Sequence, residues 1–145
     1  MLKRDKLQLT PSMEDYLEMI YRNCKKVGYV RIYQLSDALN VQAPSATRTV
    51  QRLAKVGLVK YQKYGIIQLT KEGERIGEFL LERHLLIESF LSKLGITDTL
   101  LKDTEMIEHN ISMEALESIE AFNAFLEENP EILKEYEEFK KSREL

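Results

Sequence analysis

Apolar positions in the first third of the chain recur with the spacing of short amphipathic helices. Thr10-Pro11 is typical of a helix N-terminus, and the apolar stripe behind it ends near Gly28. A second helix is predicted over 32–39, and a third begins at Pro44 after a tight turn. The pattern predicts a helix-turn-helix.

The period changes after Gly57. The runs 58–61 and 66–69 are β-like and flank a turn-like segment, which predicts a β-hairpin wing. The rest of the chain returns to helical spacing, with expected helices over about 71–93, 98–110, 112–126 and 131–141. We therefore expect a mainly α protein with one small hairpin.

Composition narrows the class of protein. No segment resembles a signal peptide or a bilayer-spanning stretch, so we expect a soluble, cytoplasmic protein with no membrane partner. Lys3, Arg4 and Lys6 are expected to form a loose tail, with an ordered arm near DNA as the alternative. The single cysteine, Cys24, excludes an internal disulfide framework and a cysteine-cluster zinc site, and its place in an apolar stripe predicts that it lies in the core.

The net charge of −3 conceals an asymmetry between the two halves. Residues 1–75 hold 14 Lys or Arg against 7 Asp or Glu, a balance of +7, whereas residues 76–145 hold 7 against 17, a balance of −10. A basic first half favours a polyanionic partner. An acidic second half favours a cation site, an oligomer surface or only a solvated face.

The third predicted helix has a polar, cationic face without carboxylates. Arg and Gln side chains can pair with base edges and Ser can hold phosphates, so this face is typical of a recognition helix in the major groove. The alternative, an ordinary solvated face, is less favoured because a wing and a basic half accompany the helix. The candidate DNA-binding residues are Gln42, Pro44, Ser45, Thr47, Arg48, Gln51, Arg52 and Lys63.

Both histidines have acidic neighbours at helical spacing. Glu105, Glu108 and His109 fall on one face of one predicted helix, where they can converge on a single ion. His84 has Glu88 four positions later. The alternatives are a solvated acidic face and, for His84, a buried structural histidine.

Asp15 and Glu18 lie three positions apart on the first helix and point away from its apolar stripe. Clustered carboxylates repel one another, so a bound divalent cation would explain such clusters. Hard oxygen ligands with some imidazole suit Mn²⁺ or Fe²⁺. A solvated helix flank is the alternative for this pair.

Four segments of the sequence carry a family resemblance. They read Pro-Ser-Met-Glu-Asp-Tyr-Leu-Glu at 11–18, Pro-Ser-Ala-Thr at 44–47, Arg-His at 83–84 and Glu-Met-Ile-Glu-His at 105–109. Together they resemble the diphtheria-toxin-repressor family of iron- and manganese-dependent regulators, and in particular its manganese transport regulators. The resemblance extends from about residue 11 to residue 139.

The resemblance implies a Mn²⁺-responsive transcriptional repressor of metal-uptake genes, and not an enzyme. Such a protein binds a double-stranded DNA operator as a homodimer, with the divalent metal as co-repressor. The implied fold is a winged helix-turn-helix DNA-binding domain over 1–70, followed by an all-helical dimerisation and metal-binding domain over 71–145. The linking helix spans about 71–93. The ligands implied for a pair of ions per chain are Asp15, Glu18, His84, Glu105, Glu108 and His109.

Two positions distinguish the branches of the family. The iron-responsive branch typically has Met where Asp15 stands and Cys where Glu105 stands, so the harder ligands here favour Mn²⁺. Fe²⁺ remains an alternative, and Zn²⁺, Cd²⁺ or Co²⁺ can bind such a site in vitro. Asn110 departs from the pattern, at a position where a second His can follow the one matching His109.

Three other functions remain as alternatives. The first is an iron-responsive regulator of the same family, and the second is a winged-helix regulator that senses no metal. The third is a di-metal hydrolase or oxidase in a helical bundle, since carboxylate and His ligands also build catalytic centres. The enzyme is least favoured, because it leaves the wing and the cationic helix face without a role.

Overall fold

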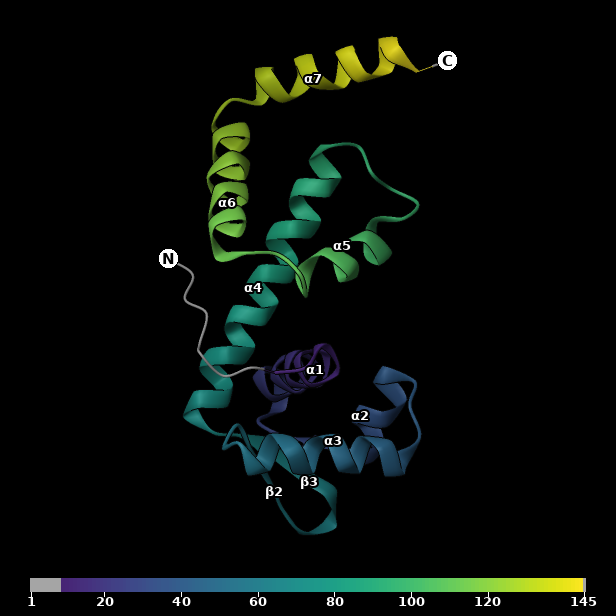
Figure 1. The fold of residues 1–145 in the computed structure, drawn as a ribbon, viewed down its shortest axis with the longest axis vertical. Helices are drawn as coiled ribbons and strands as arrows, with labels where there is room; N and C mark the ends of the chain where they lie inside the picture. The colour runs from purple at the N-terminus through teal and green to yellow at the C-terminus, as the bar shows by residue number, and fades with distance from the viewer. Residues whose placement is uncertain (1–8, 145) are drawn as a thin grey trace. The chain divides into compact units, whose positions relative to one another are not determined.

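The structure is a computed structural model that describes residues 9–144 (Figure 1). These residues form two compact units, 9–81 and 82–144, and the boundary between the units falls inside α4 (Lys71–Lys93). The basic tail segment expected at Lys3, Arg4 and Lys6 lies outside the described residues.

The first unit contains a helix-turn-helix and a small sheet, as the sequence pattern predicts. Its three strands are antiparallel in the order β1-β3-β2, with Val30 opposite Ile67 and Val59 opposite Leu69. The short strand β1 was not predicted, because two residues are too few to show a period. The elements are α1 (Pro11–Val27), β1 (Val30–Arg31), α2 (Ile32–Leu39), α3 (Ala43–Lys55), β2 (Val59–Tyr61), the 3-10 turn η1 (Lys63–Gly65) and β3 (Ile66–Leu69).

Local signals set the ends of α1. The Thr10 Oγ1 atom accepts a hydrogen bond from the Met13 backbone N–H at 3.1 Å, which satisfies one of the amides at the helix start. Gly28 ends the helix in the left-handed region, with φ 86°. The apolar face of α1 then packs with α2, α3 and the sheet around fully buried side chains, namely Leu17, Ile20, Leu35, Ala46, Val50, Leu53, Leu58 and Ile67.

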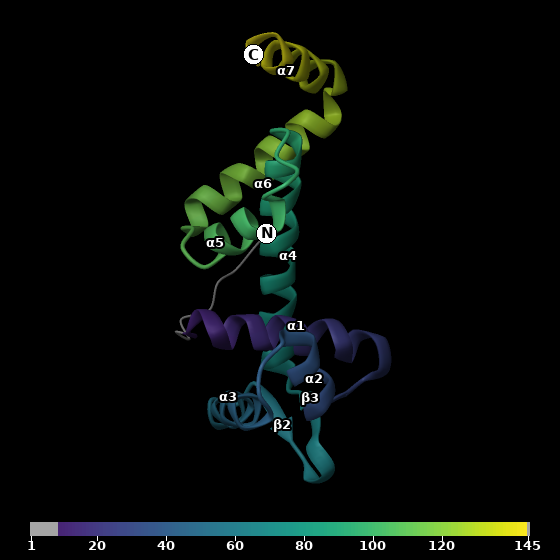
Figure 2. The same cartoon turned by 90° about the vertical axis from the view of Figure 1, so that its right-hand side faces the viewer.

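The helix α3 lies beside β2, and the hairpin formed by β2 and β3 extends past α3 (Figures 1 and 2). Thr70 joins the sheet to the start of α4: its Oγ1 donates to the Gly57 carbonyl at 2.7 Å and accepts from the Gly73 N–H at 3.0 Å. Thr70 therefore connects the loop after α3 with the first turn of α4.

The second unit is entirely helical over its described residues. It contains the later part of α4, then α5 (Leu100–Glu108), α6 (Met113–Glu128) and α7 (Pro130–Arg143). Tyr136 and Lys140 of α7 both donate to the Leu94 carbonyl at the end of α4, at 3.1 and 2.7 Å. These bonds hold α7 against α4 by satisfying a carbonyl that the helix itself leaves free.

Among the described residues, no helix is long and apolar enough to cross a bilayer.

Candidate metal centre and nucleic-acid interface

The helix α3 is buried on one side and polar on the other. It begins at Ala43, one residue before the predicted start, and Ala46, Val50 and Leu53 are fully buried. Ser45 and Thr47 are half-buried at its start. The exposed candidates in α3 and at its N-cap are Gln42, Pro44, Arg48, Gln51 and Arg52.

Electrostatics at both ends of α3 favour an anionic partner. The first turn contains no acidic residue, so its backbone amides and the positive end of the helix dipole are not neutralised by a carboxylate of that turn. The last turn carries Arg52 and Lys55. Arg48 donates to the Ser45 hydroxyl at 3.3 Å, and Lys63 is exposed in the wing turn. The surface can therefore contact phosphates as well as base edges.

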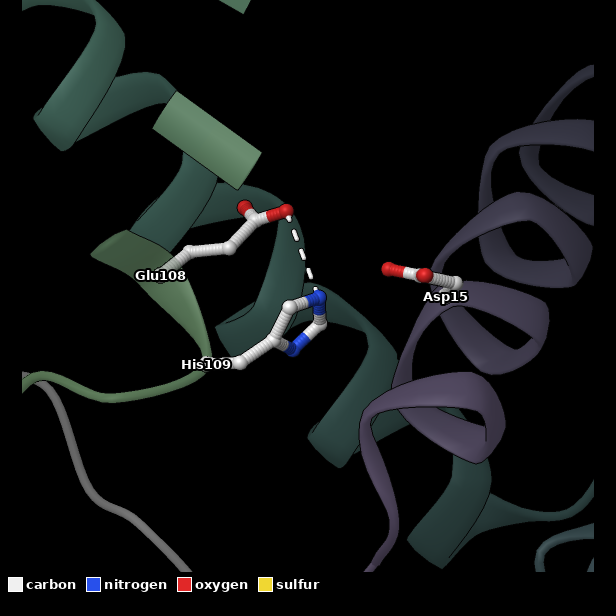
Figure 3. A group of neighbouring side chains, drawn as sticks. All are labelled: Asp15, Glu108 and His109. Atoms are coloured by element: carbon white, nitrogen blue, oxygen red, sulfur yellow. Dashed lines mark ion pairs between the residues drawn. The ribbon is translucent and has the colours of Figure 1, made fainter. Parts of the chain in front are cut away.

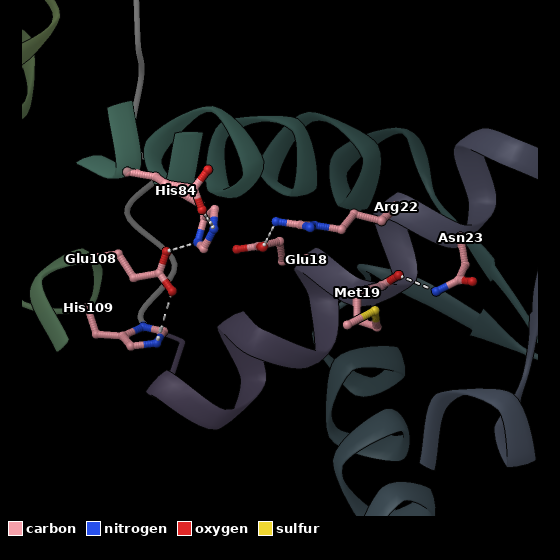
Figure 4. A network of polar contacts seen from close by, with 8 residues as sticks. Glu18, Met19, Arg22, Asn23, His84, Glu108 and His109 are labelled. Atoms are coloured by element: carbon pink, nitrogen blue, oxygen red, sulfur yellow. Dashed lines mark hydrogen bonds and ion pairs between the residues drawn. The ribbon is translucent and has the colours of Figure 1, made fainter. Parts of the chain in front are cut away.

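The carboxylates of α1 differ in their surroundings. Asp15 is exposed, whereas the Glu18 side chain is only 14% exposed and accepts a hydrogen bond from Arg22 Nη2 at 2.7 Å (Figure 4). The pair with Arg22 offsets part of the negative charge at this end of the unit. Asp15 and Glu18 lie three positions apart, so both occupy one side of α1.

In the second unit, an imidazole lies within reach of each oxygen of Glu108. His84 Nδ1 lies 3.0 Å from Glu108 Oε2 (Figure 4). His109 Nε2 lies 3.8 Å from Glu108 Oε1 (Figures 3 and 4). The Glu108 side chain is only 2% exposed. A buried carboxylate is costly unless a cation or strong hydrogen bonds compensate it, so this arrangement calls for positive charge.

The other ring nitrogen of His84 also faces a carboxylate. His84 Nε2 lies 3.3 Å from Glu88 Oε2, so carboxylate oxygens approach both nitrogens of one ring. A neutral imidazole has only one N–H to donate. With one N–H, a neutral His84 can donate to only one of these carboxylates, and a cation bound at this group would balance the charge of both.

These atoms fit a hard divalent cation. The donors that the structure gathers in this unit are carboxylate oxygens and imidazole nitrogens, and no thiolate is among them. That donor set suits Mn²⁺ or Fe²⁺ better than ions that prefer sulfur.

Two of the predicted ligands lie near or beyond the end of α5. Glu105 is exposed one turn before Glu108 on α5, and His109 lies just beyond the helix end as its C-cap. The prediction of one continuous helix over 98–110 was therefore too long. Glu88 was not among the predicted ligands, although its spacing of four from His84 was the signal that could have included it.

Cys24 does not lie in the core as predicted. It is half-buried and lines a cavity of about 310 Å³ with Lys25, Lys60 and Glu74 among the other lining residues. Burial raises the pKa of the Cys24 thiol, and the nearby Glu74 carboxylate adds to the increase. Cys24 does belong to the apolar stripe of α1, but the rest of the protein does not bury that stripe along its whole length.

A basic helix-turn-helix with a wing, followed by a helical unit in which imidazoles flank a buried carboxylate, is the architecture of metal-dependent DNA-binding regulators. Residues 8–67 match the family model described as "Iron dependent repressor, N-terminal DNA binding domain". Residues 70–137 match "Iron dependent repressor, metal binding and dimerisation domain". The chain therefore belongs to the iron-dependent repressor family, which confirms the resemblance found in the sequence motifs.

Curated relatives match almost the whole chain. The HTH-type transcriptional regulator MntR of Lysinibacillus sphaericus is 39% identical over 137 residues, which cover 94% of this chain and 99% of the relative. The protein of the same name from Listeria innocua is 42% identical over 130 residues, covering 89% and 92%. These names agree with the manganese branch that the motifs indicated.

Two solved structures of manganese regulators resemble the chain over about half of their own length. The structure of the manganese regulator SloR is 32% identical with a TM-score of 0.69, and the match covers 79% of this chain and 54% of that chain. A manganese-dependent transcriptional repressor in complex with manganese is 29% identical with a TM-score of 0.68, covering 78% and 53%. Both likenesses agree with the mainly helical winged fold.

Proposed function

We propose that this protein is a Mn²⁺-responsive transcriptional repressor of metal-uptake genes, with the metal ion as its co-repressor. The observation that carries the proposal is the buried Glu108 carboxylate with His84 and His109 at its two oxygens. The comparisons support the proposed function, because the family is one of metal-dependent repressors and similar solved structures are of proteins named as manganese regulators. A regulator of chromosomal genes is expected to act in the cytoplasm.

We propose six metal ligands, which hold a pair of ions in each chain. A bound divalent cation would neutralise the buried carboxylate and join oxygen and nitrogen donors in one coordination sphere. Asp15 and Glu105 favour Mn²⁺ over softer ions because both offer carboxylate oxygen. The proposed ligands are Asp15, Glu18, His84, Glu105, Glu108 and His109.

The proposed DNA interface is the exposed face of α3 together with the wing. Arg48, Gln51 and Arg52 would read base edges in the major groove, and Lys63 would hold the phosphate backbone. The start of α3 would lie at the groove edge, where it would contact phosphates through Gln42, Pro44, Ser45 and Thr47. We propose 1–70 as the DNA-binding domain and 71–145 as the dimerisation and metal-binding domain.

The proposed response to metal is a linkage between the two groups of ligands. Asp15 and Glu18 belong to the unit that carries α3, whereas Glu108 and His109 belong to the other. If one set of ions uses both groups, metal binding restrains the recognition helices before DNA arrives. Less ordering then remains for DNA binding, so operator affinity rises.

The same proposal includes a homodimer, as the dimerisation domain of the family suggests. Several large apolar side chains of the second unit are exposed, and such a surface usually has a protein partner. A symmetric dimer would present two recognition helices to successive major grooves. The side chains that we assign to this surface are Leu85, Leu101, Met106, Phe122 and Phe125.

Metal titration of the full-length protein tests the proposal. Metal-stripped protein is titrated anaerobically with Mn²⁺ and Fe²⁺ by calorimetry, and we expect about two Mn²⁺ per chain. Asp15→Met replaces a hard ligand with a thioether and is expected to weaken the response to Mn²⁺. Asp37→Met is the matched control, because Asp37 is an exposed helical aspartate of the same unit outside the proposed ligands.

Operator binding then tests the linkage. A duplex selected from a random library by the Mn²⁺-loaded protein should bind at least about tenfold more tightly in Mn²⁺ than in chelator, or about 1.4 kcal/mol of coupling. Equal affinities in the two conditions would refute metal control and leave a winged-helix regulator of unknown signal.

The iron-responsive function is the second candidate, because the matching family models describe iron-dependent repressors. It predicts that Fe²⁺ raises operator affinity more than Mn²⁺ does at equal free concentration. The same binding assay decides between the two ions.

A further inference from the structure

The wing ends in an aromatic residue whose backbone is strained. Tyr64 has φ 64° and ψ 23°, in the left-handed region, and its side chain is 89% exposed. This backbone region costs a bulky residue about 1 kcal/mol, and glycine adopts it freely. Tyr64 therefore destabilises the wing, and burial of its exposed ring offsets little of this free-energy cost.

The strain comes from the way the wing is built. The Gln62 N–H donates to the Ile66 carbonyl at 2.8 Å, and Gln62 Nε2 donates to Gln68 Oε1 at 2.6 Å, so Gln62 joins the two strands at the base of the turn. Gly65 lies so close to α2 that a Cβ there would come within 2.7 Å of the Ile32 side chain. These contacts determine the path of the turn, and they hold Tyr64 in the left-handed region.

Strained backbone is often found at functional sites, so an exposed aromatic residue with a strained backbone suggests a binding role and not a role in stability. The charges around it suggest the partner, because Lys60 and Lys63 are exposed on the same hairpin and residues 1–75 carry a balance of +7. The helix α3, with its cationic face, packs against β2 in the same unit. A polyanion that lies along α3 can also reach the wing.

We infer that Tyr64 is a contact to the DNA backbone: its hydroxyl donates to a phosphate oxygen and its ring packs against the adjoining sugar. The inference rests on the proposed DNA-binding function and adds a residue to it. A phenol is neutral, and a backbone contact carries no sequence information. Tyr64 therefore adds affinity equally on all sequences, without adding to the salt dependence that charged contacts produce.

The test compares Tyr64→Gly with wild type in the Mn²⁺-loaded, full-length protein. The probes are the selected duplex and a mixed-sequence duplex of equal length. Tyr64→Gly should weaken binding to both about tenfold and leave the ratio of the two affinities unchanged. It should also raise the melting temperature by about 2–4 °C, because glycine relieves the strained backbone.

Two further variants separate the parts of the contact. Tyr64→Phe keeps the ring and removes the hydroxyl, so it should retain part of the lost affinity. Lys63→Ala should lower the slope of log affinity against log salt concentration by about one, whereas Tyr64→Gly should leave that slope unchanged. Wild-type affinity in Tyr64→Gly, or a changed ratio between the two duplexes, would overturn the inference.

Arg48→Ala distinguishes this failure from that of the proposed function. If Arg48→Ala weakens binding to the selected duplex while Tyr64→Gly does not, only the inference fails. If wild-type protein binds neither duplex in Mn²⁺, the proposed function fails, and the inference fails with it.

Discussion

Among single residues, Glu108 shows which properties of the candidate metal site the sequence predicted and which it did not. The sequence identified Glu108, His84 and His109 as candidates from helical spacing, and the structure adds that the carboxylate is buried with an imidazole near each oxygen. His84 and Glu108 are 24 positions apart in the sequence, so no local spacing pattern relates them. Burial and long-range pairing therefore came only from the fold.

Cys24 yields a prediction about reactivity. Burial and the Glu74 carboxylate raise the pKa of its thiol, so at neutral pH the folded protein holds less reactive thiolate than an ordinary cysteine does. We expect slow reaction with a disulfide reagent in the folded protein and faster reaction in urea at the same pH. The folded-state rate should increase as pH rises toward the raised pKa, and equal rates in the two states would contradict this account.

Among the elements, the start of α4 depends on a close contact with the sheet. Thr70 caps the helix by accepting from the Gly73 N–H, and this brings Gly73 against the chain at Leu58. A Cβ at Gly73 would overlap the Leu58 carbonyl oxygen. The contact accounts for a glycine inside a helix, where alanine is normally preferred.

We predict that Gly73→Ala lowers the free energy of unfolding by about 1–3 kcal/mol, as overpacking of a tight contact does. Intrinsic helix propensity alone would change stability in the opposite direction, so the sign of the effect identifies the clash. Urea denaturation measures it. Glu74→Ala, an exposed neighbour on the same helix, is the control and should change stability by less than about 0.5 kcal/mol.

For the whole molecule, the second unit leaves aromatic side chains exposed. Phe122 and Phe125 are 44% and 45% exposed, and their rings stack on each other at 6.4 Å between centroids. Phe122 also meets Phe90 edge-on at 6.1 Å. Such a cluster is typical of the centre of a protein interface, which fits the proposed homodimer.

Phe125→Glu is predicted to weaken the dimer at least about tenfold, because a charge would be buried without a partner in the interface. Sedimentation velocity over a range of protein concentrations measures the dissociation. The control is Tyr33→Glu, which changes an exposed aromatic residue of the other unit and should remain dimeric. A Phe125→Glu protein that is folded by circular dichroism and still dimeric at the wild-type concentration would exclude this surface.

The sequence alone determined the order and type of the main elements and the family of the protein. Helical and strand periods follow from backbone geometry, so the apolar spacing was sufficient for the helix-turn-helix, the wing and the helical second half. The four motifs at 11–18, 44–47, 83–84 and 105–109 were together sufficient for the family, because the residues within each motif are neighbours in the chain. Contacts between distant segments were decided by the tertiary structure: the pairing of β1 with β3, the approach of Glu108 to His84, and the close contact of Gly65 with Ile32 beside the strained Tyr64. Each of these depends on which surfaces pack together, and packing joins residues that no local pattern relates.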